Sequence, residues 1–262
     1  KDKRFGREIP PELRQPIPSH LEDFYQIEKH SMLEKEPPYH TRIRSLVLRA
    51  FTTRKISQFN EELDQLCHKL IDEFSEHEVD LLPTYAQKIP IIIIARLLGI
   101  PEEMSDQLLS WSNAMVAMYQ ARRTTEIEKE ANQSAADFRV YLKAYIDERR
   151  KNPRDDLLSN LIQAEELGEK LTTAELISTV VLLLNAGHEA TVHTLGNGIK
   201  TLIETRNPRK WTQPDLINKT VEEILRFDPP LHMFNRYAYE DLELFDVKIQ
   251  CGQEIMLMLA AS

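Results

Sequence analysis

The sequence predicts a mainly α-helical fold with a small β region near its C-terminal end. Of the 262 residues, 42% are hydrophobic, 29% are charged and only seven are glycine, a composition typical of a helix-rich globular chain. Apolar residues recur at helical spacing through most of the chain. After about residue 235 the pattern changes to short apolar runs separated by turn residues, which is typical of strands.

Capping residues and prolines indicate where the elements begin and end. Thr172 or Thr173 precedes an apolar run with Glu175 in its first turn, a capping pattern. Pro229-Pro230 stop the last helix, because proline cannot continue one. Helices are expected over 19–30, 37–50, 53–74, 85–98, 102–121, 126–150, 155–166, 172–203 and 216–227, and strands over 235–239, 242–244, 247–250 and 254–259, with Cys251-Gly252 as a turn.

Charge and hydropathy exclude several classes of partner. A net charge of −9 argues against nucleic acid, which needs a basic surface. The apolar stretches at 89–98 and 176–184 are too short to span a bilayer, and no signal-peptide pattern precedes them. Cys67 and Cys251 give no disulfide framework, which fits a reducing compartment. We therefore expect a cytoplasmic protein without nucleic-acid or membrane partners.

The most informative segment is Leu182–Thr191, where an apolar helix acquires a glycine and a carboxylate. Glycine in a helix costs about 0.8–1 kcal/mol relative to alanine, and a carboxylate among leucines costs more unless it is paired. The pattern predicts a buried site in which a ligand approaches the backbone at Ala186-Gly187. There Glu189, beside a hydroxyl residue, is suited to deliver protons. A core helix with a tolerated polar kink is the plainer alternative.

A metal site is not expected in this segment. His188-Glu189 followed by His193 resembles the pattern of zinc proteases, but those need histidines four residues apart. A spacing of five leaves the two side chains about 140° apart around the helix. Hydrolysis likewise finds no support, because no nucleophilic serine with a matched base is present nearby.

Four segments in this order resemble the cytochrome P450 family, particularly its soluble bacterial members: Pro37–Arg44, Ala186–Thr191, Glu223–Arg226 with the following Phe227-Asp-Pro-Pro230, and Asn235–Asp241 continuing to Ile255. The resemblance implies a P450-like fold that binds haem. It covers nearly the whole chain, which we interpret as a single partial domain, residues 1–262, of that fold.

The first segment is similar to the family's helix beside the haem propionates. The resemblance places His40 and Arg44 on these propionates, and side chains four apart share one helical face. Arg236 occupies the position of a further propionate ligand. A solvated basic helix is the alternative for the first segment taken alone.

The second segment resembles the family's oxygen-binding groove. The resemblance gives Ala186 and Gly187 contact with dioxygen and haem, and Glu189 a part in proton delivery. The family's usual threonine after the acid is Ala190 here. Thr191 follows it, but one residue rotates a side chain by about 100° around a helix, so Thr191 is not an automatic substitute. Water or a substrate hydroxyl is the alternative proton source.

The third and fourth segments imply a structural pair and a pocket. Glu223 and Arg226 match the family's E-x-x-R pair, which belongs to a buried ion-pair network. Taken alone, such a pair is common on helix surfaces. The resemblance also gives a substrate pocket lined by Leu231, His232, Met233 and Phe234.

The family's iron ligand is a cysteine in an F-x-x-G-x-x-x-C-x-G loop that these residues do not contain. Cys251 lies in a predicted hairpin turn, and Cys67 lies on a helical core face. We expect these residues to be part of a haem-thiolate monooxygenase that uses O2, an apolar organic substrate and a ferredoxin or reductase electron donor. The alternative is a truncated, non-catalytic helical protein that binds a ligand or partner without haem.

A basic patch is a further expectation. Four basic residues lie within or shortly after the first segment, Pro37–Arg44: Arg42, Arg49, Arg54 and Lys55. On an acidic chain such a patch suits an acidic electron donor. An ordinary solvated face is the alternative.

Overall fold

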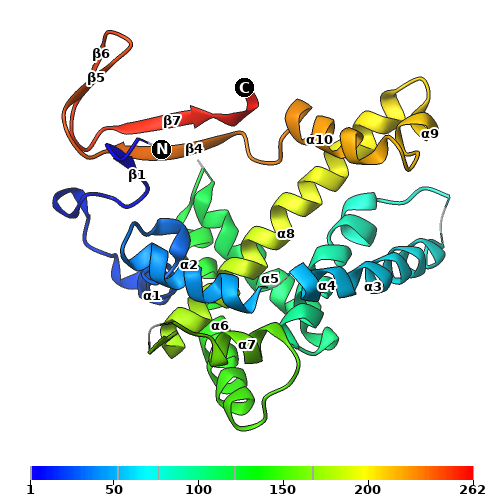
Figure 1. Cartoon of the computed structure of the whole chain (residues 1–262), viewed down its shortest axis with the longest axis horizontal. Coiled ribbons are helices and arrows are strands. Elements are labelled where there is room, and N and C mark those ends of the chain that lie inside the picture. The colour runs from blue at the N-terminus through cyan, green and yellow to red at the C-terminus, as the bar shows by residue number, and fades with distance from the viewer. Residues whose placement is uncertain (1, 52, 76, 121, 167, 262) are drawn as a thin grey trace. The chain divides into compact units, whose positions relative to one another are not determined.

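The computed structural model describes residues 2–51, 53–75, 77–120, 122–166 and 168–261 (Figure 1). The chain divides into two compact units. One comprises Lys1–Leu13, Cys67–Pro90 and His188–Ser262, and we call it the sheet unit. The other comprises Arg14–Leu66 and Ile91–Gly187, and we call it the helical unit.

The predicted mainly helical fold with a small β region is confirmed. The α-helices are α1 Glu22–Glu28, α2 Tyr39–Ala50, α3 Thr53–Asp72, α4 Lys88–Leu98, α5 Ser105–Val116, α6 Thr125–Lys151, α7 Leu157–Gln163, α8 Thr173–Glu204, α9 Pro208–Trp211 and α10 Ile217–Phe227. The strands are β1 Phe5–Gly6, β2 Glu165–Glu166, β3 Glu169–Lys170, β4 Met233–Ala238, β5 Leu242–Leu244, β6 Val247–Ile249 and β7 Glu254–Met258.

Several boundaries differ from the sequence prediction for local reasons. The helix expected at 85–98 is preceded by a π turn, Leu82–Ala86, before α4. The helix expected at 155–166 ends at Gln163, because residues 165–166 instead pair with 169–170 as a hairpin. Strand β1 and the short helix α9 were not expected. Ala121, the expected end of one helix, lies outside the described residues.

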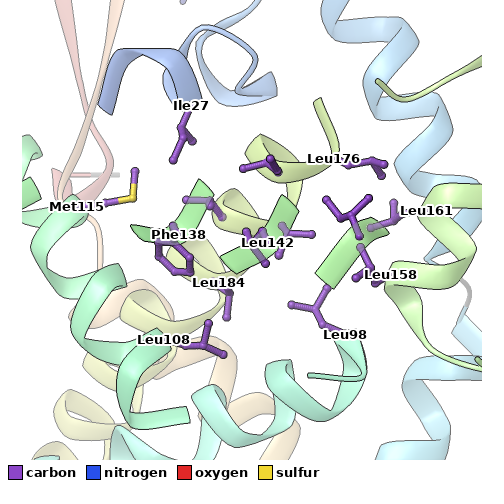
Figure 2. Close-up of a cluster of buried hydrophobic side chains, with 14 of the residues drawn as sticks. Ile27, Leu98, Leu108, Met115, Phe138, Leu142, Leu158, Leu161, Leu176 and Leu184 are labelled. Atoms are coloured by element: carbon purple, nitrogen blue, oxygen red, sulfur yellow. The ribbon is translucent and has the colours of Figure 1, made fainter. Parts of the chain in front are cut away.

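The core of the helical unit forms around α6. One face of α6 places Phe138, Leu142 and Ile146 in a continuous apolar cluster, which side chains of α1, α2, α5, α7 and α8 complete (Figure 2). Trp111 of α5 lies 4.9 Å from the ring of Phe138 between centroids. Burying apolar surface contributes about 25 cal/mol per Å2, so this cluster is the main stabilising element of the unit.

A buried guanidinium joins three segments at the edge of this core. Arg149, near the end of α6, is 1% exposed. Its Nε donates to Asp156 Oδ2 at 3.0 Å, and its Nη2 donates to the carbonyl of Gly99 at 3.0 Å. Asp156 in turn accepts from the backbone of Ser159 at 2.7 Å and caps α7. The ring of Tyr145 lies 4.4 Å from the guanidinium carbon.

The arrangement around Arg149 also explains why glycine occupies position 99. It ends α4 with φ of +71°, a conformation that glycine adopts without strain. A Cβ at this position would lie 2.2 Å from Asp156 Oδ2, so a side chain would displace the carboxylate that pairs with Arg149.

The sheet unit carries a three-stranded antiparallel sheet in the order β1-β4-β7. Phe5 pairs with Ala238 on one side, and Arg236 pairs with Ile255 on the other. Strands β5 and β6 form a hairpin, and the predicted turn before β7 is confirmed, with Gly252 at φ of +85°. Its conformation explains why glycine occupies this position.

Replacing Arg149 by Met should lower the free energy of unfolding by about 3–5 kcal/mol, because the buried Asp156 carboxylate loses its charged partner. Urea denaturation measures the change. Arg150→Met is the matched control, since the neighbouring Arg150 pairs with Asp147 in an exposed i, i+3 bridge and should cost about 0–1 kcal/mol. Equal losses in both variants would contradict a structural role for the buried guanidinium.

Candidate active site

The glycine of the central segment lies closely packed against a side chain of α4. Helix α8 runs unbroken through Ala186 and Gly187, and a Cβ at Gly187 would lie 2.8 Å from Ile94 Cδ1 of α4. Apolar side chains likewise approach the other two glycines of α8, where a Cβ would lie 3.0 Å from Leu82 Cδ2 at Gly196 and 3.1 Å from Ile224 Cδ1 at Gly198. The expected close approach to the backbone exists, and neighbouring side chains make it.

The expected burial of Glu189 is wrong. Its side chain is 48% exposed and lies 3.8 Å from His193 Nε2, one turn along α8. Ala186, Ala190 and Thr191 are exposed as well. An exposed carboxylate with a histidine neighbour avoids the cost of a charge among leucines. Glu189 and Thr191 therefore belong to the solvent-exposed face of α8.

The buried polar residue of the segment is His188, which the sequence interpretation did not select. It is 3% exposed and follows the buried Leu184 and precedes the buried Val192 at i, i+4 spacing. This periodicity was the signal that could have found it. His193 is 53% exposed, so the two histidines do lie on different faces, as their spacing of five predicts.

Burial lowers the pKa of His188 below its ordinary 6.5, while the backbone of Gln87 acts in the opposite direction. Neither ring nitrogen makes a hydrogen bond of normal geometry within the described part of the chain. The imidazole is therefore neutral at pH 7, since a charged ring would be far more costly to bury.

Helix α2 presents two basic side chains on one face. His40 is half-buried and Arg44 is exposed, four residues further on. Neither side chain makes a hydrogen bond or ion pair with any residue that the structure describes. Donors left without a partner on one face suit an anionic ligand.

Arg42, between them, is already engaged. Its guanidinium pairs with the carboxylate of Glu175 and lies 3.4 Å from Glu169 Oε2. The expectation of Arg42 as part of a free basic patch is therefore wrong. The side chains of Arg54 and Lys55 lie outside what the structure describes.

Glu175 connects α2 with the first turn of α8, and it is 3% exposed. The backbone N–H of Thr172 donates to Glu175 Oε2 at 2.9 Å, and the N–H of Glu175 donates to Thr172 Oγ1 at 3.2 Å. This reciprocal pair confirms the predicted capping box. Burial acts to raise the pKa of Glu175, but hydrogen bonds from Thr172 and Tyr39 and the charge of Arg42 outweigh it and lower the pKa below 4.5.

The Glu223–Arg226 pair forms on α10 in the sheet unit. Arg226 Nε and Nη2 donate to the two oxygens of Glu223, both at 2.7 Å. The hydrogen bond from Arg226 lowers the pKa of Glu223. Both side chains are about 60% exposed, so the pair is not part of a buried network here.

The remaining candidates lie on and before β4. Leu231, His232 and Met233 are exposed and Phe234 is half-buried. Arg236 is half-buried, and its Nη1 donates to the carbonyl of Asn235 at 2.8 Å. It makes no ion pair with any described residue. A partly buried guanidinium without a carboxylate is a candidate anion-binding group.

Neither a cavity nor a metal-binding cluster adds a further candidate site among the described residues. A cavity of about 270 Å3 in the sheet unit contains none of the predicted site residues and is lined by Leu70, Glu73, Phe74, Ser75, Glu78, Val79, Asp80, Thr84 and Lys88. Within the described ranges no cluster of three or more His, Cys, Asp or Glu side chains could hold a metal ion. No described helix is both long and apolar enough to cross a membrane.

Comparison with known proteins decides the family. The model of the family described as Cytochrome P450 matches residues 13–262. The chain belongs to the cytochrome P450 family. The chain is 36% identical to the polyketide biosynthesis cytochrome P450 PksS of Bacillus subtilis over all of its own length and 65% of that protein. It is 36% identical to the vitamin D(3) 25-hydroxylase of Pseudonocardia autotrophica over 88% of this chain and 57% of that protein.

The fold is similar to solved P450 structures. P450BioI, in a complex with a hexadec-9Z-enoic acid-ligated acyl carrier protein, matches with a TM-score of 0.91 and 31% identity, covering all of this chain and 67% of that one. The chain thus spans about two thirds of the length of P450BioI, and slightly less of PksS.

The donors present fit haem, which P450 relatives bind. The cofactor carries two propionate carboxylates, and the side chains of His40, Arg44 and Arg236 make no ion pair with any described residue, so their N–H groups suit such carboxylates. Cys67 and Cys251 do not fit the iron ligand. Cys67 contacts Tyr85 along a packed helix, and Cys251 lies in the turn before β7.

Glu175→Gln should lower the free energy of unfolding by about 2 kcal/mol at pH 7, because the capping and Arg42 bonds lose their ionised acceptor. A lowered folded pKa means that this stabilisation is complete above about pH 4.5 and is lost as pH falls through the folded value. The advantage of the natural protein over the variant should therefore shrink below pH 4.5 in urea unfolding. Glu130→Gln, at an exposed site of α6, is the control. A difference independent of pH would contradict the assignment.

Proposed function

We propose that these residues belong to a haem-thiolate monooxygenase that inserts one oxygen atom from O2 into an apolar organic substrate. The second oxygen atom leaves as water, with two protons and two electrons consumed. Membership of the P450 family is the observation that carries the proposal. Because the chain spans only part of its relatives, the activity is proposed for the whole protein.

Three side chains would hold the cofactor by its carboxylates. His40 and Arg44 present donors from one face of α2, and Arg236 presents a guanidinium from β4. Haem with a thiolate ligand supplies the electron density that favours cleavage of the O–O bond. We place that thiolate on a cysteine other than Cys67 and Cys251.

Proton delivery is assigned to the exposed face of α8. The carboxyl group of Glu189, whose Oε1 is the oxygen nearest to His193, passes the proton on, and Thr191 carries a hydroxyl two residues further along. Ala186 and Gly187 carry no polar side-chain atom, so a ligand that approaches the backbone there would meet an apolar surface. Ala190 lacks the hydroxyl usual in the family, which makes water or a substrate hydroxyl the natural complement.

The substrate is bound by apolar contact with Leu231, Met233 and Phe234, with His232 among them. Leu231 and Met233 are exposed large apolar side chains one residue apart, with the half-buried Phe234 next to them, and such a group suits an apolar ligand. P450BioI was solved with an acyl carrier protein and PksS acts in polyketide biosynthesis, so a long acyl chain is the first substrate class to test.

Electrons are proposed to come from a ferredoxin or a reductase. With Arg42 bound to Glu175, the basic residues of α2 that remain exposed are Arg44 and Arg49. A surface this small gives modest steering of an acidic donor. We further propose that the protein acts in the cytoplasm and that its two units are parts of one domain.

The first test is an absorbance spectrum of the reduced protein under carbon monoxide, with the intact mass of the same sample. We expect a thiolate-type haem band and a mass above 30.5 kDa, because the ligand cysteine must come from further residues. A sample of 30.5 kDa without haem would contradict the proposal and favour the alternative, a non-catalytic helical ligand-binding protein.

Ala190→Thr should raise the fraction of electrons that end in product, since it adds a hydroxyl beside Glu189 on the exposed face of α8. Product formed per NAD(P)H consumed measures this coupling. Ala174→Thr makes the same change at an exposed site in the first turn of α8 and should have no effect. Unchanged or poorer coupling in Ala190→Thr would favour the water or substrate route.

A further inference from the structure

We propose that the buried His188 is a positioning residue of the reaction, which holds α8 in the rotation that keeps Glu189 and Thr191 on its solvent-exposed face. The inference deepens the proposed function and rests on it, because these two residues are the proton carriers assigned there. All three residues belong to the sheet unit, and so does the π turn before α4, so the contacts between them lie within a single unit.

One stripe of α8 packs against the π turn that precedes α4. His188 and Val192 are 3% and 4% exposed, and Gly196 continues the stripe at the same i, i+4 spacing. A Cβ at Gly196 would lie 3.0 Å from Leu82 Cδ2, at the start of the π turn. The backbone of Gln87, just after the turn, acts on the ring of His188. The π turn therefore lies along this stripe.

His188 is the polar member of an otherwise apolar stripe. Neither of its ring nitrogens makes a hydrogen bond of normal geometry with any residue that the structure describes. Burial of such a group costs stability, and an apolar side chain of similar volume would avoid that cost. Functional sites are where a chain departs from the rules of a satisfied core. The imidazole therefore serves something other than stability at this position.

A polar ring offers a directional contact with Gln87. The backbone of Gln87 acts to raise the pKa of His188, as a nearby acceptor does, so a ring N–H faces its carbonyl oxygen in a loose contact. The backbone of Gln87 is itself held, because its N–H donates to the carbonyl of Leu82 at 2.9 Å. An N–H···O contact weakens steeply as the donor turns away, whereas an apolar contact has no preferred direction. The ring therefore resists rotation of α8.

The rotation of α8 decides where its polar side chains lie. Successive residues of an α-helix are about 100° apart, so Glu189 lies one such step around the axis from His188. Thr191, three residues on, lies about 60° to the other side. A misplacement of about 1 Å can cost about 100-fold in rate, so the reaction depends on a contact that fixes this rotation. The position of π turns at many functional sites agrees with this role.

The test uses the purified haem protein and the variants His188→Leu, His188→Gln and Val192→Ala. Leucine keeps the apolar volume without a donor, and glutamine keeps a neutral side-chain N–H. Val192→Ala is the matched control, because it removes an apolar contact one turn along the same stripe. The measurements are the urea midpoint of unfolding, kcat and KM for oxidation of dodecanoate, and the 15N NMR spectrum of histidine-labelled protein.

A positioning role predicts that His188→Leu unfolds at the same or a higher urea concentration than the natural protein, while its kcat falls about 10-fold with KM unchanged. His188→Gln should recover most of kcat, because its amide N–H can meet the same carbonyl. Val192→Ala should show the opposite pattern, with earlier unfolding and unchanged kcat. The ring of His188 should give the 15N shifts of a neutral imidazole with one slowly exchanging N–H at pH 7.

A purely structural role predicts that His188→Leu and Val192→Ala behave alike, with earlier unfolding and unchanged kcat, and that result would overturn the proposal. Failure of His188→Gln to recover kcat would also overturn it, since the N–H contact would then not be what matters. A rapidly exchanging ring N–H would contradict the contact with Gln87. Absence of haem from the natural protein is a separate outcome, which contradicts the proposed function itself and removes the reaction that His188 would serve.

Discussion

The buried carboxylate of Glu175 is the interaction on which the candidate site of the helical unit depends. It closes the first turn of α8 with Thr172 and binds Arg42 of α2. Helix α2 carries His40 and Arg44, and α8 carries Gly187. One ionised group therefore connects α2 with the first turn of α8. Its pKa is lowered because the surrounding donors outweigh the cost of burial.

The candidate cofactor ligands differ from such structural charges because they have no charged partner among the described residues. Arg149 and Glu175 are buried and have charged partners. His40, Arg44 and Arg236 have no charged partner among the described residues, although each is held by a regular element. Folding has therefore paired the charges that support the helices and has left these three basic side chains without a carboxylate, which suits an anionic ligand.

Helix α8 separates packing from chemistry around its own axis. One side carries Leu184, His188 and Val192, all buried, and the other exposes Glu189 and Thr191. Glycines let neighbouring helices approach the same helix closely. This division explains how a long apolar helix carries an acid without the penalty of a buried charge, since the carboxylate stays in contact with solvent.

The sequence by itself determined the order of the longer helices and of the last four strands, the capping box at Thr172, the turn at Gly252 and the family motifs, because periodicity, capping and turn chemistry act over a few residues. Only the tertiary structure decided which charges are buried. It showed Arg149 in the core, Arg42 bound to Glu175 and Glu189 in solvent. Burial and ion pairing join residues that are distant in sequence, so a local pattern does not contain them.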